Sequence, residues 1–425
     1  MPVTALPLVA ALPFVALLLT IALAPVAAPH WWHHNRNKAL VTLLLSAPIL
    51  VYLRMHAPEL LNEKLNEYVS FIVVIAALFV VTGGIHIRGS LAGTPLVNTG
   101  VLGVGAILAN LLGTTGASVL LIRPLLRANK RRKRVAHIVI FFIFIVANCG
   151  GLLTPIGDPP LLLGFLKGVP FEWTLRLWPQ WLLLNGVLLL IFNLWDQRAL
   201  NKDEQELPGS QHEEVLIHEP LRVQGGIEML VLLGIIISIV LAASSLVIVG
   251  LALIGYFAGS RDRRTKNAFT FGPIIEVGVL FAGIFATMAP VLEMLNAWAQ
   301  RPDFELTKPV HFFWASGGLS SVLDNAPTYL AFAASAAGLQ GVPPHGAYIG
   351  ALTLDPVAAK LLAAISTGAV CMGANTYIGN APNFMVKAIA EENGVQMPSF
   401  FGYLLYSCGI LLPLFVLVSV VFFRR

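Results

Sequence analysis

The feature that most constrains this chain is a series of continuous apolar runs, most of them near 20 residues long, along almost its whole length. An α-helix of about 20 residues spans the hydrocarbon core of a bilayer. Hydrophobic residues make up 57% of the 425 residues and charged residues only 12%, and a water-soluble chain needs a larger polar share. The sequence therefore predicts a polytopic membrane protein.

The runs predict helices, because the strands of a membrane barrel alternate polar and apolar residues over about 10 positions. Two apolar stretches, 97–127 and 309–340, are interrupted near their middles by polar residues, Gly or Pro. Two others, 135–165 and 356–390, are too long for one straight helix and carry Gly and Pro inside, which predicts broken helices. The remaining spans are expected at about 4–28, 39–55, 68–87, 174–195, 224–243, 245–258, 272–297 and 401–423. We expect the first of these to be a retained helix, since it lacks the positive start of a secretory signal.

Basic residues assign the sides of the membrane, because cytoplasmic loops carry the Lys and Arg excess. The run Lys130–Arg134 and the basic residues between Arg261 and Lys266 are placed inside. The number of membrane crossings then agrees with these sides only if 97–127 enters and leaves from the cytoplasm and 309–340 enters and leaves from outside. Both stretches are therefore predicted to be re-entrant hairpins. The same count leaves the C-terminus outside, against the rule.

A repeated motif divides the chain into two halves. Residues 149–160 read CGGLLTPIGDPP and residues 371–382 read CMGANTYIGNAP, so that Cys, Gly, Thr, Ile, Gly and Pro recur at a constant offset, with Asp158 opposite Asn380. Five spans and one hairpin lie on each side of a polar linker, and an odd number of spans inverts the second unit. We predict an all-α protein of two inverted repeats, residues 1–195 and 223–425, joined by a cytoplasmic linker at 196–222.

Inverted repeats with paired broken helices are typical of secondary transporters, whose sites lie near the bilayer midplane. Carbonyls freed at the breaks, together with Thr, Asn and Asp side chains, can coordinate a hard cation, and half-helix N-termini can hold an anion. Asp158 and Asp324 are the only carboxylates expected deep in the membrane, where an ionisable group is a functional candidate by default. The candidate ion- and substrate-binding residues are Asp158, Asp324, Thr154, Asn325, Thr328, Asn375, Thr376, Asn380, Thr114, Thr115, Ser118 and Asn148. Of these, Asp158, Asp324, Asn325, Thr154 and Thr376 are the candidate Na⁺ ligands.

Other conspicuous residues have simpler interpretations. Cys149 and Cys371 follow long apolar runs and are expected to be small packing residues. The basic run at 130–134 is interpreted as a topology anchor near anionic lipid and not as a nucleic-acid patch. The sequence has no P-loop, no nucleotide fingerprint and no HExxH motif, which argues against ATP-driven transport. We expect no enzyme activity and no cofactor beyond a coupling ion, Na⁺ or H⁺; a channel is disfavoured because inverted broken helices favour alternating access.

These motifs resemble the ion transporter superfamily, over essentially the whole chain. That group includes NhaD-type sodium/proton antiporters, arsenite carriers, citrate–metal symporters and divalent anion/sodium symporters, and proteins of this kind are often placed in a citrate-transport branch. Residues 147–158 are similar to the broken-helix motif of the NhaD-type antiporters, and residues 323–328 to their second hairpin. The resemblance implies a homodimer whose scaffold and transport subdomains move in an elevator-like fashion. The divalent anion symporters carry Ser-Asn-Thr at both hairpin tips, and this chain does not.

The sequence thus favours a cation/proton antiporter, most simply Na⁺/H⁺, in a bacterial inner membrane. Asp158 and Asp324 would exchange protons for the cation, since a carboxylate can bind either. The alternative is a Na⁺- or H⁺-coupled carrier of citrate, a dicarboxylate or another oxyanion, in which the two aspartates would hold the coupling cation. The expected partners are a small inorganic cation and a proton, an organic anion in the alternative, and the lipid bilayer, with no nucleic acid.

Overall fold

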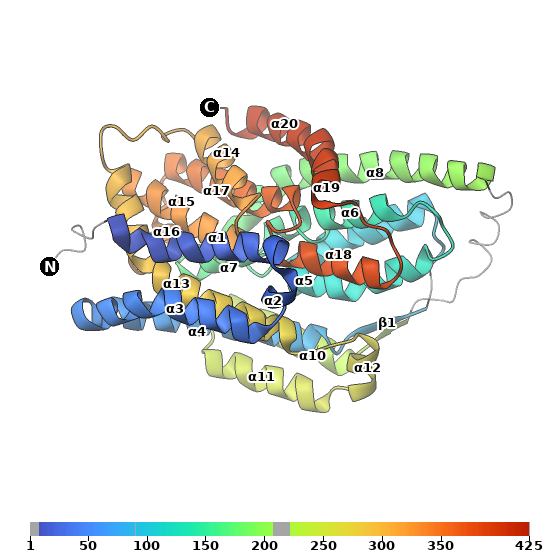
Figure 1. The fold of residues 1–425 in the computed structure, drawn as a ribbon, viewed down its shortest axis with the longest axis horizontal. Coiled ribbons are helices and arrows are strands. Elements are labelled where there is room, and N and C mark those ends of the chain that lie inside the picture. The colour runs from blue at the N-terminus through green and yellow to red at the C-terminus, as the bar shows by residue number, and fades with distance from the viewer. Residues whose placement is uncertain (1–7, 90, 207–221, 425) are drawn as a thin grey trace.

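The computed structural model describes residues 8–89, 91–206 and 222–424, and almost all of its regular structure is α-helical (Figure 1). Within these ranges, 9 helices are long and apolar enough to cross a membrane, and two shorter apolar helices accompany them. The prediction of an all-α polytopic membrane protein is confirmed.

The elements of the first half begin at Leu8 and end with a long helix at Glu206. They are η2 (Leu8–Ala11), α1 (Leu12–Ala27), α2 (Pro29–Trp32), α3 (Asn35–His56), α4 (Pro58–Thr82), β1 (His86–Arg88), α5 (Pro95–Ala128), α6 (Ala136–Ile145), η3 (Cys149–Leu153), α7 (Pro159–Leu166), η4 (Phe171–Leu177) and α8 (Trp178–Glu206).

The elements of the second half follow the polar linker. They are β2 (Arg222–Gln224), α10 (Gly226–Val240), α11 (Ser245–Ala258), α12 (Arg261–Lys266), α13 (Gly272–Ala299), α14 (Pro309–Ser320), α15 (Asn325–Leu339), α16 (Tyr348–Ala351), α17 (Pro356–Met372), η5 (Gly373–Asn375), α18 (Ala381–Glu392), α19 (Phe400–Tyr406), the π-helical turn η6 (Ser407–Leu411) and α20 (Leu412–Phe422).

Helix α5 is folded back on itself and forms hairpin 1. Its backbone leaves the helical region at Gly113, where φ is 75° and ψ is 156°, a conformation that favours glycine. At its two ends, the buried side chains of Asn98 and Asn129 exchange hydrogen bonds of 2.9 Å in both directions. The two ends of this 34-residue segment therefore lie side by side, as the predicted hairpin at 97–127 requires.

Helices α14 and α15 form hairpin 2, with a short turn at residues 321–324. The rings of Phe312 and Phe332, one on each arm, lie edge to face at 6.3 Å. The open ends of the two hairpins lie at opposite ends of the molecule (Figure 1). Hairpin 1 opens beside the end of α8, and hairpin 2 opens beside the end of α13, where Asn296 donates to the carbonyl of Ala334.

The two broken helices have the same local backbone. Thr154 has φ −135° and ψ 154°, and Thr376 has φ −136° and ψ 166°. Asp158 and Asn380, at the N-caps of α7 and α18, are both extended, with φ of −147° and −151°. The repeated motif therefore produces the same break twice, and the inverted relation of the two complete halves stays a prediction.

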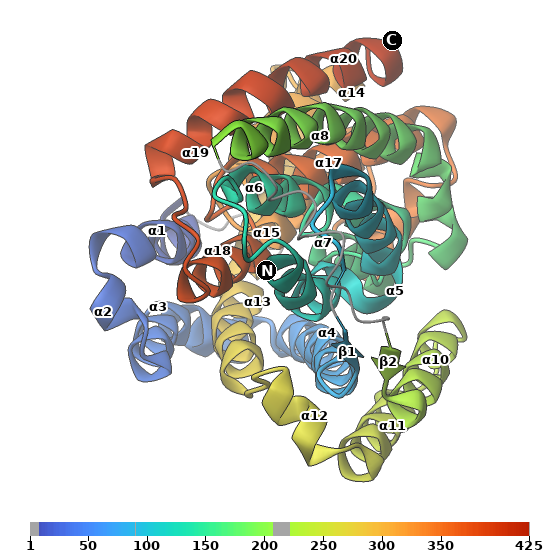
Figure 2. The ribbon, with the colours of Figure 1, turned by 90° about the vertical axis from the view of Figure 1, so that its right-hand side faces the viewer.

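The helices fall into two groups when the molecule is seen from its end (Figure 2). Helices α3, α4, α10, α11 and α13 occupy one side, and the two hairpins, the broken helices, α8 and α20 occupy the other. At the edge of the first group, Gly283 of α13 is packed so closely on Thr42 of α3 and Leu17 of α1 that a methyl group there would clash. Close contact at small residues is the usual way that membrane helices pack.

One expected boundary was wrong. Helix α4 begins at Pro58 and not near 68, so that Glu63, Lys64 and Glu67 lie in its first turns. Their charges are paired there: Lys64 lies 3.3 Å from Glu67, and Lys167 at the end of α7 contacts both glutamates. Ion pairing allows charged residues to be part of a helix that is otherwise apolar. A hydropathy profile alone does not show such pairing.

The linker predicted at 196–222 is helical in its first part, because α8 continues to Glu206. Residues 207–221 of the linker lie outside the described residues. Its last residue opens a short strand that sequence patterning did not indicate: β2 pairs antiparallel with β1, with Arg222 opposite Arg88 and Gln224 opposite His86. This pairing ties the end of the linker to the segment just before hairpin 1.

Candidate functional site

The side chain of Asp158 lies where the two hairpins and the two breaks converge. It is only 1% exposed, and it accepts three hydrogen bonds. Thr114, at the tip of hairpin 1, donates to Oδ1 at 2.7 Å; Asn325, at the tip of hairpin 2, donates to Oδ2 at 2.5 Å. Asn380, in the second break, donates to Oδ1 at 3.3 Å. Residues from four separate segments thus meet at one carboxylate.

The local sequence explains how Asp158 reaches this place. Pro159 and Pro160 start α7 and cannot continue a helix from the preceding segment, so Asp158 becomes the N-cap with an extended backbone. Gly157, just before it, lies against the backbone of Gly151 so closely that any side chain would clash. The carbonyl oxygen of Gly157 also accepts a hydrogen bond of 2.8 Å from the backbone N–H of Thr114. The first break and the tip of hairpin 1 are therefore fastened backbone to backbone.

Thr154 and Thr376 play equivalent parts in the two breaks. The hydroxyl of Thr154 donates to the carbonyl of Asn110 at 2.5 Å, and the hydroxyl of Thr376 donates to the carbonyl of Ser321 at 2.6 Å. Thr154 thus ties the first break to the first arm of hairpin 1, and Thr376 ties the second break to the turn of hairpin 2. Neither hydroxyl hydrogen-bonds to Asp158. The contacts that the structure shows for these two candidate Na⁺ ligands are therefore the hydrogen bonds that brace the breaks.

A chain of asparagines connects the two breaks. Asn380 donates to Oδ1 of Asn148 at 3.2 Å, and Asn148 donates to Oδ1 of Asn383 at 2.7 Å. Asn383 in turn donates to the carbonyls of Gly373 and Thr376. Asn383 and Asn110 were missed by the sequence analysis. Their positions carry no repeat signal, since Leu161 occupies the place that corresponds to Asn383.

Asp324 precedes Asn325 at the tip of hairpin 2, and it shares no hydrogen bond with Asp158. It is partly exposed and caps α15, with Oδ1 accepting from the backbone N–H of Ala326 at 3.0 Å. Its neighbour Asn325 is the residue that reaches Asp158. Capping and ion binding are compatible, because a carboxylate has further lone pairs for a cation.

A small cavity of about 80 Å³ lies beside Asp158. Its polar lining is Thr114, Thr115 and Asp158, and its remaining walls come from Gly, Pro and apolar residues of hairpin 1, the first break, α4 and α13. Pockets for organic ligands are generally larger, roughly 300–1,000 Å³. The cavity suits a small ion with one or two waters, since water occupies about 30 Å³ in the liquid.

The other predicted residues make no hydrogen bond to Asp158 among the described residues. Thr328 donates to the carbonyl of Asp324 at 2.9 Å. The amide of Asn375 donates to the hydroxyl of Ser321 at 2.8 Å, and its buried Oδ1 has no partner among the described residues. The buried hydroxyl of Ser118 is equally unpaired there. Cys149 and Cys371, expected to be packing residues, are both fully buried.

The charge balance is the most informative property of the site. Among the described residues, no Lys, Arg or His forms an ion pair with Asp158, and no group of three or more His, Cys, Asp or Glu side chains is arranged to hold a metal. The available ligands for a cation are the two carboxylates with amide, hydroxyl and carbonyl oxygens, which are ligands that hard cations prefer.

A polytopic helical protein with broken helices meeting at a buried carboxylate belongs to the class of membrane transporters. The sequence matches, over residues 3–423, the protein family described as "Putative citrate transport", and the chain belongs to that family. The match is consistent with the resemblance to the ion transporter superfamily that the hairpin and break motifs indicated. No curated protein matches the sequence.

Proposed function

We propose that this transporter exchanges a small cation, most simply Na⁺, for protons at Asp158. The observation that carries the proposal is a carboxylate that is 1% exposed and has three neutral donors but no cationic partner in the described chain. An ionised carboxylate buried without a counter-charge is costly, so the group is neutral when protonated or is balanced by a bound cation. An exchanger needs these two alternative states, in which either a proton or a cation balances the charge of the same carboxylate.

The surrounding residues have distinct parts in this scheme. Thr114, Asn325 and Asn380 orient the carboxylate and stabilise its ionised form by hydrogen bonds. Asp324, the residue before Asn325, contributes a second negative group near the same cation. Thr154 and Thr376 brace the breaks by hydrogen bonds to the two hairpins.

A second candidate is a cation-coupled citrate carrier, which the description of the family favours. In that case Asp158 holds the coupling cation, and the anion binds elsewhere at the half-helix ends. Two observations weigh against citrate at the cavity itself: its volume is about 80 Å³, and no basic residue lines it. A carboxylate in the wall would also repel a free anion.

The test is ion exchange by purified protein in liposomes. An outward Na⁺ gradient without any organic anion should acidify the lumen, because each Na⁺ that leaves is exchanged for protons that enter, as read by a trapped pH-sensitive dye. Asp158→Asn should abolish this signal. Asp355→Asn is the matched control, because Asp355 also caps a helix, α17, but at an exposed position.

The outcomes separate the two candidates. Exchange that needs only Na⁺ and is lost in Asp158→Asn supports the antiporter. Uptake of labelled citrate that depends on Na⁺ or H⁺, with no exchange in its absence, supports the citrate carrier. Normal exchange in a folded Asp158→Asn variant would overturn the role of Asp158 in both. A homodimer, an elevator-like movement and a bacterial inner-membrane location belong to the same proposal and follow from the resemblance.

A further inference from the structure

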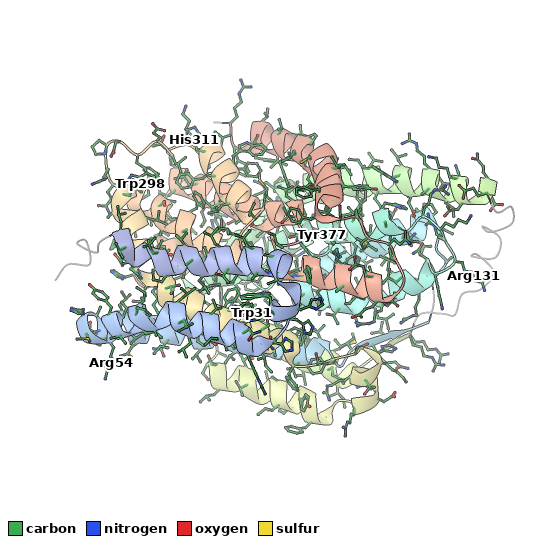
Figure 3. All side chains as sticks on the ribbon, in the orientation of Figure 1. Trp31, Arg54, Arg131, Trp298, His311 and Tyr377 are labelled. Atoms are coloured by element: carbon green, nitrogen blue, oxygen red, sulfur yellow. The ribbon has the colours of Figure 1, made fainter. Side chains whose placement is uncertain are left out.

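A second and larger cavity lies far from Asp158, at the open end of hairpin 1. Its volume is about 740 Å³, and it is enclosed by the turn between α5 and α6, by α8 and by the loop at 393–396. The turn carries Arg131, which Figure 3 places at the end of the molecule opposite Arg54 and Trp298. The proposed exchange reaction makes no use of this cavity.

The lining of this cavity is strongly basic. It includes Arg127, Lys130, Arg132, Lys133 and Arg134, and no Asp or Glu. Three of these cations have carboxylate partners outside the lining: Arg132 pairs with Asp196 at 2.5 Å, Arg134 with Asp203 at 2.6 Å and Lys133 with Glu206 at 3.3 Å. The pairs fix the basic side chains around the cavity but do not neutralise all of them.

Two cations and one buried donor remain without an acidic partner. The side chain of Lys130 makes no hydrogen bond or ion pair with any residue that the structure describes, and the guanidinium of Arg127 donates only to the carbonyl of Ile87. Arg123, one helical turn from Arg127, adds a further positive charge nearby. The Arg132 side chain is only 1% exposed, and its buried Nε has no hydrogen-bond partner in the described chain. Such donors indicate an anionic ligand.

The tryptophans of α8 indicate the level of the cavity within the membrane. Trp178 and Trp195 are both well exposed, at 59% and 39%, and their separation of 17 helical residues corresponds to about 26 Å along the axis. Tryptophans that flank a span mark the two membrane interfaces. Trp195 lines the cavity together with Tyr406, and the two rings lie 5.7 Å apart. The basic residues therefore lie at the level of the lipid headgroups, on the side assigned to the cytoplasm.

We propose that this cavity binds the phosphate of an anionic phospholipid headgroup, held by Arg127, Lys130 and the Nε of Arg132. The aromatic wall of Trp195 and Tyr406 accommodates the glycerol and the first part of the acyl chains. Basic pockets between helices at this depth are suited to such headgroups. A bound lipid would join the base of hairpin 1 to the loop after α18, two segments of the proposed transport machinery.

Native mass spectrometry and thermal unfolding of the full-length protein in a non-ionic detergent test the proposal. Phosphatidylglycerol should remain bound and raise the unfolding temperature, and phosphatidylcholine should not. The double variant Arg127→Gln/Lys130→Gln should bind phosphatidylglycerol at least about tenfold more weakly. The control is Arg261→Gln/Lys266→Gln, which removes two charges from α12, a basic cytoplasmic segment away from the cavity.

A soluble ligand of the same chemistry is distinguished by a second arm with inorganic phosphate and pyrophosphate. Stabilisation by these ions, lost in the Arg127→Gln/Lys130→Gln variant, supports a phosphate site that is filled from solution. Equal lipid and phosphate binding by the wild type and this variant would overturn the site. Stabilisation by citrate alone would overturn the assignment to phosphate. The unfolding temperature of each variant without ligand shows whether it is folded.

Discussion

At the scale of the residue, the two adjacent hydroxyls at the tip of hairpin 1 offer a sharp test of the proposed site. The hydroxyl of Thr114 donates to Asp158, and Thr115 lines the same cavity with a hydroxyl that makes no hydrogen bond to any described residue. A hydrogen bond to a charged group contributes about 1.5–3 kcal/mol. Thr114→Val should therefore raise the Na⁺ concentration for half-maximal exchange by roughly 10- to 100-fold, since the ionised carboxylate loses a donor.

Thr115→Val is the matched control, because it removes the same hydroxyl one residue away. We expect it to change the half-maximal Na⁺ concentration much less, as measured by the same liposome assay over a Na⁺ series. Equal effects of the two substitutions would contradict the role assigned to the Thr114 hydroxyl. Both variants keep a β-branched side chain of the same shape, so a difference in folding is not expected.

At the scale of the element, a cluster of charges joins α4 to the end of α7. Lys167 contacts Glu63 and Glu67, and the backbone N–H of Gly346 donates to Glu63 at 3.1 Å. The side chains of Lys64 and Lys167 are each only 4% exposed. Removing one partner of a buried ion pair costs up to about 3–5 kcal/mol, and without Lys167 the two glutamates share a single cation, Lys64. Lys167→Met should therefore clearly lower the temperature of thermal unfolding.

The control is Lys266→Met, which breaks the exposed pair of Lys266 and Asp262, spaced four residues apart on α12. Such pairs contribute about 0.3–0.5 kcal/mol, so its unfolding temperature should hardly change. Hydrogen exchange gives a second reading: in Lys167→Met, protection should fall first at the start of α4 and in the loop before α16. An unchanged unfolding temperature and unchanged protection would show that the cluster does not hold these elements together.

The elements differ in how far their sequence predicts them, for physical reasons. The breaks at 149–160 and 371–382 were predictable, because Pro and Gly act on the local backbone wherever they occur. Asp158 and the tips with Thr114 and Asn325 followed from the repeat and the count of spans. The bracing by Asn110 and Asn383, and the buried pair of Arg132 with Asp196, depend on contacts between distant segments. No local pattern predicts such contacts, and the sequence pattern places Asp196 at the start of the polar linker.

At the scale of the whole molecule, the two ends of the bundle are assigned to opposite sides of the membrane, and this assignment can be tested directly. The end with Lys130 is assigned to the cytoplasm by its basic residues. The last helix, α20, returns to the other end, where Phe423 lies against Phe313 in the first arm of hairpin 2, with ring centroids 5.1 Å apart. With Lys130 assigned to the cytoplasm, this packing predicts that Arg424 lies outside, although the positive-inside rule alone would predict that it lies inside.

Single cysteines at these two positions settle the orientation. In a background with Cys408→Ser, the remaining Cys149 and Cys371 are buried and should not react. Arg424→Cys should be labelled by a membrane-impermeant maleimide in intact cells, and Lys130→Cys only after the membrane is opened. The reverse pattern would invert the molecule, and it would move the basic cavity to the outer face. Labelling of both positions from one side would instead contradict the arrangement of α20 against hairpin 2, because the two ends of one bundle cannot face the same solution.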